Sequence, residues 1–201
     1  MGNEIIFRIT FFILLGAMLV VRIYFNLRVR QQGERVMPDR EAIRHEGVVM
    51  FATRVVLFFV LIAILVLYAI HHPWMQALSF KLPAGLRWFG FVIGLGSIAF
   101  LVWTQVQLGR QFSPQLQIRQ EHQLITAGPY THIRHPLYTA VIGFGLALAL
   151  VSAHWIFLAF FILSLAGLWF RVPKEERMLI DQFGEEYKVY MQRTGKFLPK
   201  V

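Results

Sequence analysis

The sequence has no cysteine among its 201 residues. This absence excludes disulfides, cysteine nucleophiles and thiolate metal sites. Acidic residues are also scarce, with 11 Asp and Glu against 20 Lys and Arg and a formal net charge of +9. No glycine-rich dinucleotide or P-loop pattern and no H-E-x-x-H zinc motif occurs. His71 and His72 have no carboxylate near them in the sequence, so we expect a loop pair there and no metal site.

Hydrophobic residues make up 57% of the chain, whereas soluble domains contain about 45–50%. Several apolar runs reach the roughly 20 residues that a helix needs to cross a hydrocarbon core. We therefore expect a single all-α integral membrane domain over residues 1–201. Five transmembrane helices are predicted, at residues 5–27, 48–70, 85–108, 136–151 and 155–172.

These predicted spans divide the chain at residue 108. Residues 1–108 hold three of them, and residues 109–201 hold a polar segment, a hairpin made by the last two spans, and a tail. In the tail, apolar residues recur at helical spacing between charges, which predicts an amphipathic helix over residues 173–201.

The basic residues are distributed unevenly between the predicted spans. Segments 28–47, 109–135 and 171–201 hold 15 of the 20 Lys and Arg. The loops on the opposite side, 71–84 and 152–154, hold Lys81 alone. The positive-inside rule then predicts a multi-pass protein with its N-terminus outside and its C-terminus in the cytoplasm. The positive charge is explained by topology and anionic lipid, so no nucleic-acid partner is expected.

Two polar clusters fall on the predicted cytoplasmic side. The first closes a long polar segment and reads Arg134-His135-Pro136-Leu137-Tyr138. The second, Arg171-Val172-Pro173-Lys174-Glu175-Glu176, follows the last apolar run. Because both lie on one side, we predict that they meet at the membrane surface and form one small-molecule site.

Each cluster by itself has two interpretations. Pro136 suits the first position of a helix. The first cluster is therefore either a helix start preceded by a basic membrane anchor, or a site where the free N–H groups of the helix start bind an anion. Arg171 could reach the interface from the end of a span, with Pro173 beginning a helix and Glu175 and Glu176 in its first turn. The same side chains could also bind a cationic or hydroxyl-rich ligand.

Three further features have local meaning. Gly128-Pro129 predicts a turn that folds the polar segment back. The third span presents Gly90, Gly94, Gly96 and Ser97, a small-residue surface against which another helix can pack closely. Arg54 either reaches the membrane surface or faces inward in a functional role.

Taken together, the motifs resemble the isoprenylcysteine carboxyl methyltransferase family and the wider group that includes phospholipid N-methyltransferases. The resemblance covers roughly the C-terminal half. The motifs that carry it are LGRQFS at 108–113, His122-Gln123-Leu124-Ile125, Gly128-Pro129-Tyr130, Arg134 to Tyr138, the Arg171 to Glu176 cluster, and FGEEYKVYM at 183–191.

This resemblance implies a membrane-embedded enzyme that uses S-adenosylmethionine without a Rossmann domain. It implies that Arg171 faces the methyl acceptor, while Glu176 matches the family pattern less closely than Glu175. The implied cofactor contacts are Gln117, His122, Gln123, Leu124, Ile125, Tyr130, Arg134, His135, Pro136, Leu137, Tyr138, Glu175 and Glu176.

The chemistry of the acceptor distinguishes the alternatives. A carboxylate is already ionised at neutral pH and needs an anchoring cation such as Arg171, whereas an amine must first lose a proton to a base. We therefore expect carboxyl methylation of a lipophilic acceptor that enters from the bilayer. N-methylation of a phospholipid, an NADPH-dependent reaction of the sterol-reductase kind and a non-catalytic membrane role remain as alternatives, and the oligomeric state is open.

Overall fold

A computed structural model describes residues 2–31, 48–108 and 124–200. Within these ranges the chain forms helices and two isolated β-bridges, with no strand. The expected all-α fold is therefore confirmed. The elements are α1 (Gly2–Gln31), α3 (Val48–Ala69), α4 (Pro73–Ala77), α5 (Ala84–Leu108), the 3-10 turn η2 (Gly128–Thr131), α6 (Pro136–Ser152), α7 (Trp155–Phe183) and α8 (Glu185–Arg193).

Several of these helices have the length and composition of membrane spans. Three are long and apolar enough to cross a bilayer: Asn3–Arg28, Ala84–Leu108 and Trp155–Phe183. Two shorter apolar stretches, Val55–Ala69 and Pro136–Ser152, lie where the other two spans were predicted. Large apolar side chains such as Ile13, Phe59 and Trp169 are exposed on the outside of these helices, as expected for a multi-pass membrane protein.

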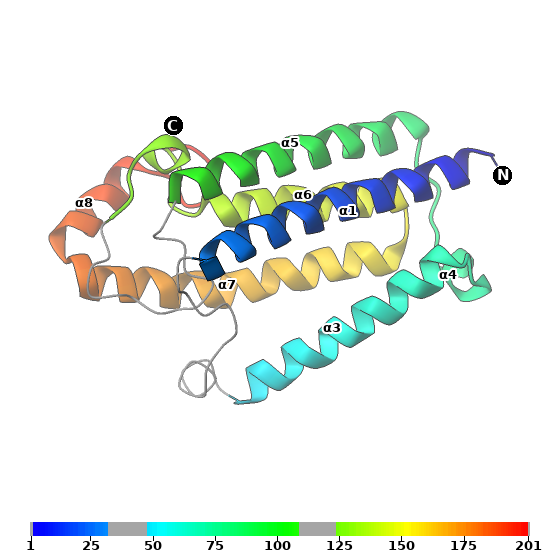
Figure 1. Ribbon diagram of the computed structural model, residues 1–201, viewed down its shortest axis with the longest axis horizontal. Coiled ribbons are helices and arrows are strands. Elements are labelled where there is room, and N and C mark those ends of the chain that lie inside the picture. Colours follow the sequence, from blue (N-terminus) through cyan, green and yellow to red (C-terminus); the bar gives the residue numbers. More distant parts are fainter. Residues whose placement is uncertain (1, 32–47, 109–123, 201) are drawn as a thin grey trace.

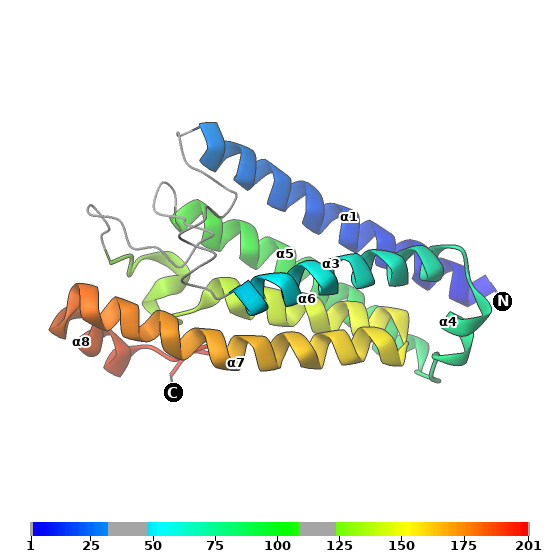
Figure 2. The ribbon, with the colours of Figure 1, turned by 90° about the horizontal axis from the view of Figure 1, so that it is seen from below.

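The long helices run roughly along one axis, so the molecule has two distinct ends (Figure 1). The N-terminus, α4 and the turn between α6 and α7 lie at one end, and η2, α8 and the C-terminus lie at the other (Figures 1 and 2). We call the second the C-terminal end. Both polar clusters are at that end, because α6 begins there and α7 leaves the bundle there.

Helices α5 and α6 form the closest pair in the bundle. A Cβ on Gly90 would lie 2.6 Å from the Leu150 Cβ, and one on Gly94 would lie 2.8 Å from Leu14 Cδ1 of α1. Ser97 lies directly against Gly143 of α6. The predicted small-residue surface is therefore confirmed at these three positions, since only small side chains let the backbones approach this closely. Gly96 was wrongly included, because it points into open space.

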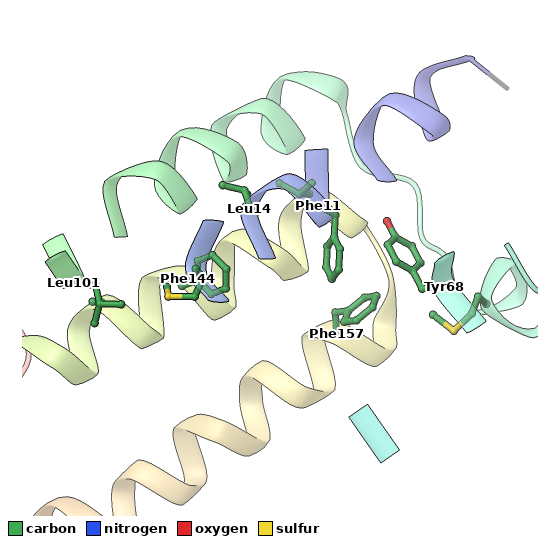
Figure 3. Packing of buried hydrophobic residues seen from close by; sticks show 10 residues of the cluster. Phe11, Leu14, Tyr68, Leu101, Phe144 and Phe157 are labelled. Atoms are coloured by element: carbon green, nitrogen blue, oxygen red, sulfur yellow. The ribbon is translucent and has the colours of Figure 1, made fainter. Parts of the chain in front are cut away.

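An aromatic cluster joins α1, α3 and α7 near the middle and the N-terminal end of the bundle (Figure 3). The Phe11 ring lies 4.7 Å from the Phe157 ring and 4.9 Å from the Tyr68 ring, measured between centroids. Among the described side chains of α3, Tyr68 is buried and attaches the end of this helix to the bundle. Toward its own N-terminus, α3 diverges from the bundle (Figure 1).

Arg87 connects three helices at the end of the bundle that holds the N-terminus, a role that the sequence reasoning did not foresee. Its guanidinium pairs with the Glu4 carboxylate at 2.5 and 3.1 Å, and its Nε donates to the Val151 carbonyl at 3.0 Å. Its Cζ also lies 3.9 Å from the centroid of the Phe7 ring. Arg87 is 4% exposed, so this buried charge is paired as burial requires, and it links α1, α5 and the end of α6.

The prediction that Pro173 begins a new helix was wrong. Helix α7 continues through Pro173 and ends at Phe183, so neither Val172 nor Pro173 marks a boundary. A proline inside a helix removes one backbone donor, but membrane helices tolerate this when local groups satisfy the freed carbonyl. As a result, Glu175 and Glu176 lie within a long helix and not in the first turn of a new one.

The tail is also not one helix. Gly184, with φ of +57°, ends α7, and α8 follows as a separate short helix. The positive φ favours glycine at this position. Tyr187 and Tyr190 of α8 are buried, so the short helix keeps the apolar face that the spacing of apolar residues in the tail predicted. Because α8 folds back at Gly184, the residues after it can return to the start of α6.

Candidate functional site

The start of α6 is shaped by the turn before it. Gly128 begins η2 with φ of +60°, and a Cβ there would lie 2.5 Å from the Gln107 side chain, so glycine is needed for two reasons. The predicted turn is therefore confirmed. Helix α6 starts at Pro136, preceded by His135 as N-cap. The rings of His135 and Tyr138 stack with centroids 5.6 Å apart, so they share one face of the start of α6, as residues three apart on a helix do.

A C-terminal strap, which we define as residues 194–198, runs alongside residues 132–135. The Arg134 N–H donates to the Gly195 carbonyl at 2.9 Å, and the His135 N–H donates to the Lys196 carbonyl at 3.1 Å. The Arg134 guanidinium also donates to the Met191 carbonyl at 3.1 Å and to the Thr194 carbonyl. The strap thereby fixes the backbone and side chain of the first cluster.

Glu176 joins the second cluster to the first. Its Oε1 accepts from Arg134 Nε at 3.0 Å and lies 3.3 Å from His135 Nε2, while its Oε2 lies 3.1 Å from Lys196 Nζ. The Glu176 side chain is 9% exposed, so water competes little for these contacts. Both carboxylate oxygens are thus occupied by groups of this chain.

Glu175 has different partners. The Tyr138 hydroxyl donates to its Oε2 at 2.6 Å, and the same hydroxyl accepts from Arg171 Nε at 2.9 Å. Arg171, Tyr138 and Glu175 therefore form one hydrogen-bond chain between α6 and α7. Within the described ranges, no other hydrogen bond or ion pair is made by Arg171 or by Glu175 Oε1, so both ends of the chain can receive a ligand.

Three tyrosines, Tyr130, Tyr187 and Tyr190, are buried at the C-terminal end. The Tyr190 hydroxyl donates to the Tyr130 carbonyl at 2.6 Å. Burial raises the pKa of Tyr190 to about 12, and it also raises the pKa values of Tyr130 and Tyr187. All three phenols therefore stay protonated at neutral pH. The Tyr187 hydroxyl is buried and has no hydrogen-bond partner among the residues that are described.

Most of the predicted site residues that the structure describes lie at the C-terminal end. Arg134 to Tyr138, Arg171, Glu175 and Glu176 come together through the contacts above. Tyr130 lies in η2, and Leu124 and Ile125 precede η2 and are half-buried. Gln117, His122, Gln123 and the side chain of Arg54 lie outside the described part of the chain.

Sequence reasoning missed the contribution of the strap. Lys196 contacts Glu176, the Phe197 ring lies 6.2 Å from the His135 ring, and the Phe197 carbonyl accepts from Thr139 Oγ1 at 2.7 Å. The only sequence signal was Gly195 between polar residues after the last helix. In residues 2–31, 48–108 and 124–200, no group of three or more His, Asp or Glu side chains is arranged to hold a metal ion.

The fold and this site define a class of protein. It is a multi-pass helical membrane protein with a charged, hydrogen-bonded site at one end of an apolar bundle, built by the start of α6 and the last turns of α7.

The model of the isoprenylcysteine carboxyl methyltransferase (ICMT) family matches residues 88–181. This segment contains both polar clusters, so the resemblance that the motifs suggested is confirmed.

Curated relatives also match part of the chain. The protein-S-isoprenylcysteine O-methyltransferase B of Arabidopsis thaliana is 31% identical over 99 residues, which is 48% of this chain and 50% of the relative. A methanethiol S-methyltransferase of Bradyrhizobium diazoefficiens is 34% identical over 71 residues, which is 35% of this chain and 24% of that protein. The chain therefore spans about half the length, or less, of the curated relatives it matches.

Among solved structures, the fold is similar to that of the eukaryotic intramembrane Ras methyltransferase ICMT. The TM-score is 0.53 with 23% sequence identity, covering 58% of this chain and 43% of that one. The ICMT-like helical fold is therefore shared.

Proposed function

We propose that this protein is an integral membrane methyltransferase that uses S-adenosylmethionine to methylate the carboxylate of a lipophilic, isoprenylcysteine-like acceptor. The observation that carries the proposal is the Arg171–Tyr138–Glu175 hydrogen-bond chain, which lies inside the segment matched by the family model. It presents a cation and a carboxylate, linked through one hydroxyl, where α7 leaves the apolar bundle.

The residues present suit this cofactor. Bound there, S-adenosylmethionine would supply a methyl group on a positively charged sulfur. Glu175 has one carboxylate oxygen without a partner among the described residues, which suits an ammonium group such as that of the methionine portion. The further contacts proposed from the resemblance are Gln117, His122, Gln123, Leu124, Ile125, Tyr130, Arg134, His135, Pro136, Leu137 and Tyr138.

Glu176 is better assigned to positioning. Because Arg134, His135 and Lys196 already occupy both of its oxygens, a ligand would have to displace one of them. We propose that Glu176 holds Arg134 and His135 in place, and that a direct cofactor contact belongs to Glu175.

Arg171 is proposed to hold the acceptor. Its guanidinium can form two parallel hydrogen bonds to a carboxylate, which fixes orientation as well as position. An ionised carboxylate needs no base, so the site needs an anchoring cation and a restricted geometry. Trp169 and Phe170, just before Arg171, are 77% and 67% exposed. This apolar approach supports entry of the acceptor from the bilayer.

The proposed orientation places this end in the cytoplasm, where the cofactor is available. It is supported by the positive-inside rule, since segments 28–47, 109–135 and 171–201 of the sequence hold 15 of the 20 Lys and Arg.

The test is methyl transfer from radiolabelled S-adenosylmethionine to N-acetyl-S-farnesylcysteine by the purified protein in detergent or nanodiscs. We expect the product to release methanol on alkali treatment, which a methyl ester does and a methylated amine or thioether does not. Alkali-stable product would instead support N- or S-methylation. Absence of transfer together with absence of S-adenosylhomocysteine binding would refute the proposal.

The Arg171→Ala variant tests the proposed anchor. We expect kcat/KM for the carboxylate acceptor to fall about 100-fold, which corresponds to loss of a charge-assisted, orienting contact. The dissociation constant for S-adenosylhomocysteine, measured by calorimetry, should change much less. Lys174→Ala, an exposed basic residue on the same helix, is the matched control and should keep its activity. Unchanged turnover of Arg171→Ala would remove Arg171 from the mechanism.

A further inference from the structure

Arg171 and Glu175 lie one helical turn apart on α7, a spacing at which opposite charges can pair directly. Here they do not: in the described part of the chain no ion pair joins them. Instead the Tyr138 hydroxyl stands between them, accepting from Arg171 Nε at 2.9 Å and donating to Glu175 Oε2 at 2.6 Å. A side chain of another helix thus holds the two charges apart.

The Tyr138 hydroxyl has one proton and two lone pairs. The proton is used on Glu175 and one lone pair is used on Arg171. A single hydroxyl direction therefore sets the side-chain conformations of both charged residues. The ring that carries it stacks on His135, and His135 is 5% exposed and held by Glu176 and the strap. The hydroxyl is consequently presented from a rigid support.

Each charged residue keeps binding capacity on the side away from Tyr138. Arg171 retains guanidinium N–H groups, and Glu175 retains Oε1, without another partner in the described ranges. This contrasts with the neighbouring Glu176, whose two oxygens are both used. In this hydrogen-bond chain Tyr138 is therefore held in place, while Arg171 and Glu175 can each bind a ligand group of the opposite charge.

We propose that Tyr138 is a positioning residue that couples the two binding subsites, so that occupation of the Glu175 subsite strengthens binding at the Arg171 subsite and the reverse. This inference rests on the proposed function, which assigns the cofactor to Glu175 and the carboxylate acceptor to Arg171. A ligand that orders one end of the chain also orders Tyr138 and the other end, so the second ligand has less conformational entropy to overcome. The contacts also polarise one another in the same direction.

Thermodynamic linkage makes the coupling measurable and reciprocal. In the wild-type protein we expect saturating N-acetyl-S-farnesylcysteine to tighten binding of S-adenosylhomocysteine by about tenfold, within the range usual for coupled sites. In Tyr138→Phe, Arg171 and Glu175 are free to pair directly. An ion pair of this spacing contributes only a factor of about two, so the coupling should fall to about twofold.

The experiment measures the dissociation constant of S-adenosylhomocysteine by isothermal titration calorimetry, with and without N-acetyl-S-farnesylcysteine, for each variant. Phe keeps the ring that stacks on His135, so the fold should persist, which the thermal midpoint in detergent checks. Tyr190→Phe is the matched control, because it removes another hydroxyl at the same end, bonded to a backbone carbonyl. Its coupling should stay at the wild-type value. Glu175→Gln provides a second variant in which the coupling should also fall.

The outcomes separate the two proposals. The inference is supported if the wild-type protein binds both ligands with about tenfold coupling and the Tyr138→Phe variant binds them with about twofold coupling. Retention of the full coupling in Tyr138→Phe overturns it while leaving the proposed function intact. Wild-type protein that binds neither ligand overturns the proposed function itself.

Discussion

Glu175 and Glu176 are adjacent carboxylates with different surroundings. Successive residues on an α-helix point about 100° apart, so Glu176 turns toward Arg134, His135 and Lys196 while Glu175 turns toward Tyr138. One carboxylate is enclosed by cationic and polar groups of its own chain, and the other keeps an oxygen available. Their functions differ for this reason, although the sequence presents them as a pair.

The contacts of Glu176 predict a large effect on stability. Glu176→Gln removes the negative charge from between Arg134 and Lys196, leaving Arg134 nearly buried without its partner. We expect the free energy of unfolding in detergent to fall by about 2–3 kcal/mol, since Gln retains one acceptor oxygen but breaks a largely buried ion pair. Thermal and denaturant unfolding followed by circular dichroism would measure it.

A matched control is available on α8. Glu185 also forms an ion pair, with Lys188 at 2.6 Å, but its side chain is 81% exposed. Glu185→Gln should change stability by less than about 0.5 kcal/mol, because exposed pairs contribute little. Equal effects of the two substitutions would contradict the structural role assigned to Glu176.

At the scale of elements, the pairing of α5 with α6 determines where the first cluster lies. Gly90 lies against Leu150, Gly94 against Ala147, and Ser97 against Gly143, so the two helices run antiparallel with a fixed register. Because α6 begins at the cluster, any shift in this register would move His135 and Tyr138 relative to α7.

Two glycines of α5 test this pairing. Gly90→Val would bring its Cβ within 2.6 Å of the Leu150 Cβ, so the helices must separate. We expect a loss of about 1–3 kcal/mol in the free energy of unfolding, together with weaker binding of S-adenosylhomocysteine. Gly96→Val, whose Cβ would meet nothing within 4 Å, should have no comparable effect. A similar loss at both positions would indicate a general cost of valine in this helix and not a packing clash.

At the scale of the whole molecule, the two ends are chemically different. The N-terminal end is closed by the Arg87–Glu4 pair and the aromatic cluster. The C-terminal end gathers both polar clusters, α8 and the strap (Figure 2). We expect the first end to face outward and the second to face the cytoplasm, since basic segments remain on the inner side.

The absence of cysteine makes this orientation straightforward to test. Single substitutions Lys81→Cys and Lys188→Cys place a thiol at exposed positions near opposite ends. In intact cells, a membrane-impermeant maleimide should label Lys81→Cys, and it should label Lys188→Cys only after permeabilisation. The reverse pattern would place the site on the outer side.

Several features of this protein could be predicted from local patterns. Long apolar runs determined the helical membrane class, Pro136 determined where α6 starts, and Gly128 determined the turn before it, because each depends on neighbours in the chain. Pro173 misled the same reasoning, since whether a proline ends a helix depends on what surrounds it, and here the helix continues to Phe183.

The sequence by itself determined that two charged clusters flank the last two apolar helices and that their residues suit a charged ligand. Only the tertiary structure decided which atoms meet: that Glu176 is held by Arg134 and by Lys196 of the strap, and that Tyr138 separates Arg171 from Glu175. The physical reason is that most of these partners are more than 30 residues apart in the sequence. Glu176 and Lys196 are closer in the sequence, and α8 between them brings them into contact. Contacts of this kind depend on how helices pack and how the chain returns, which no local spacing specifies.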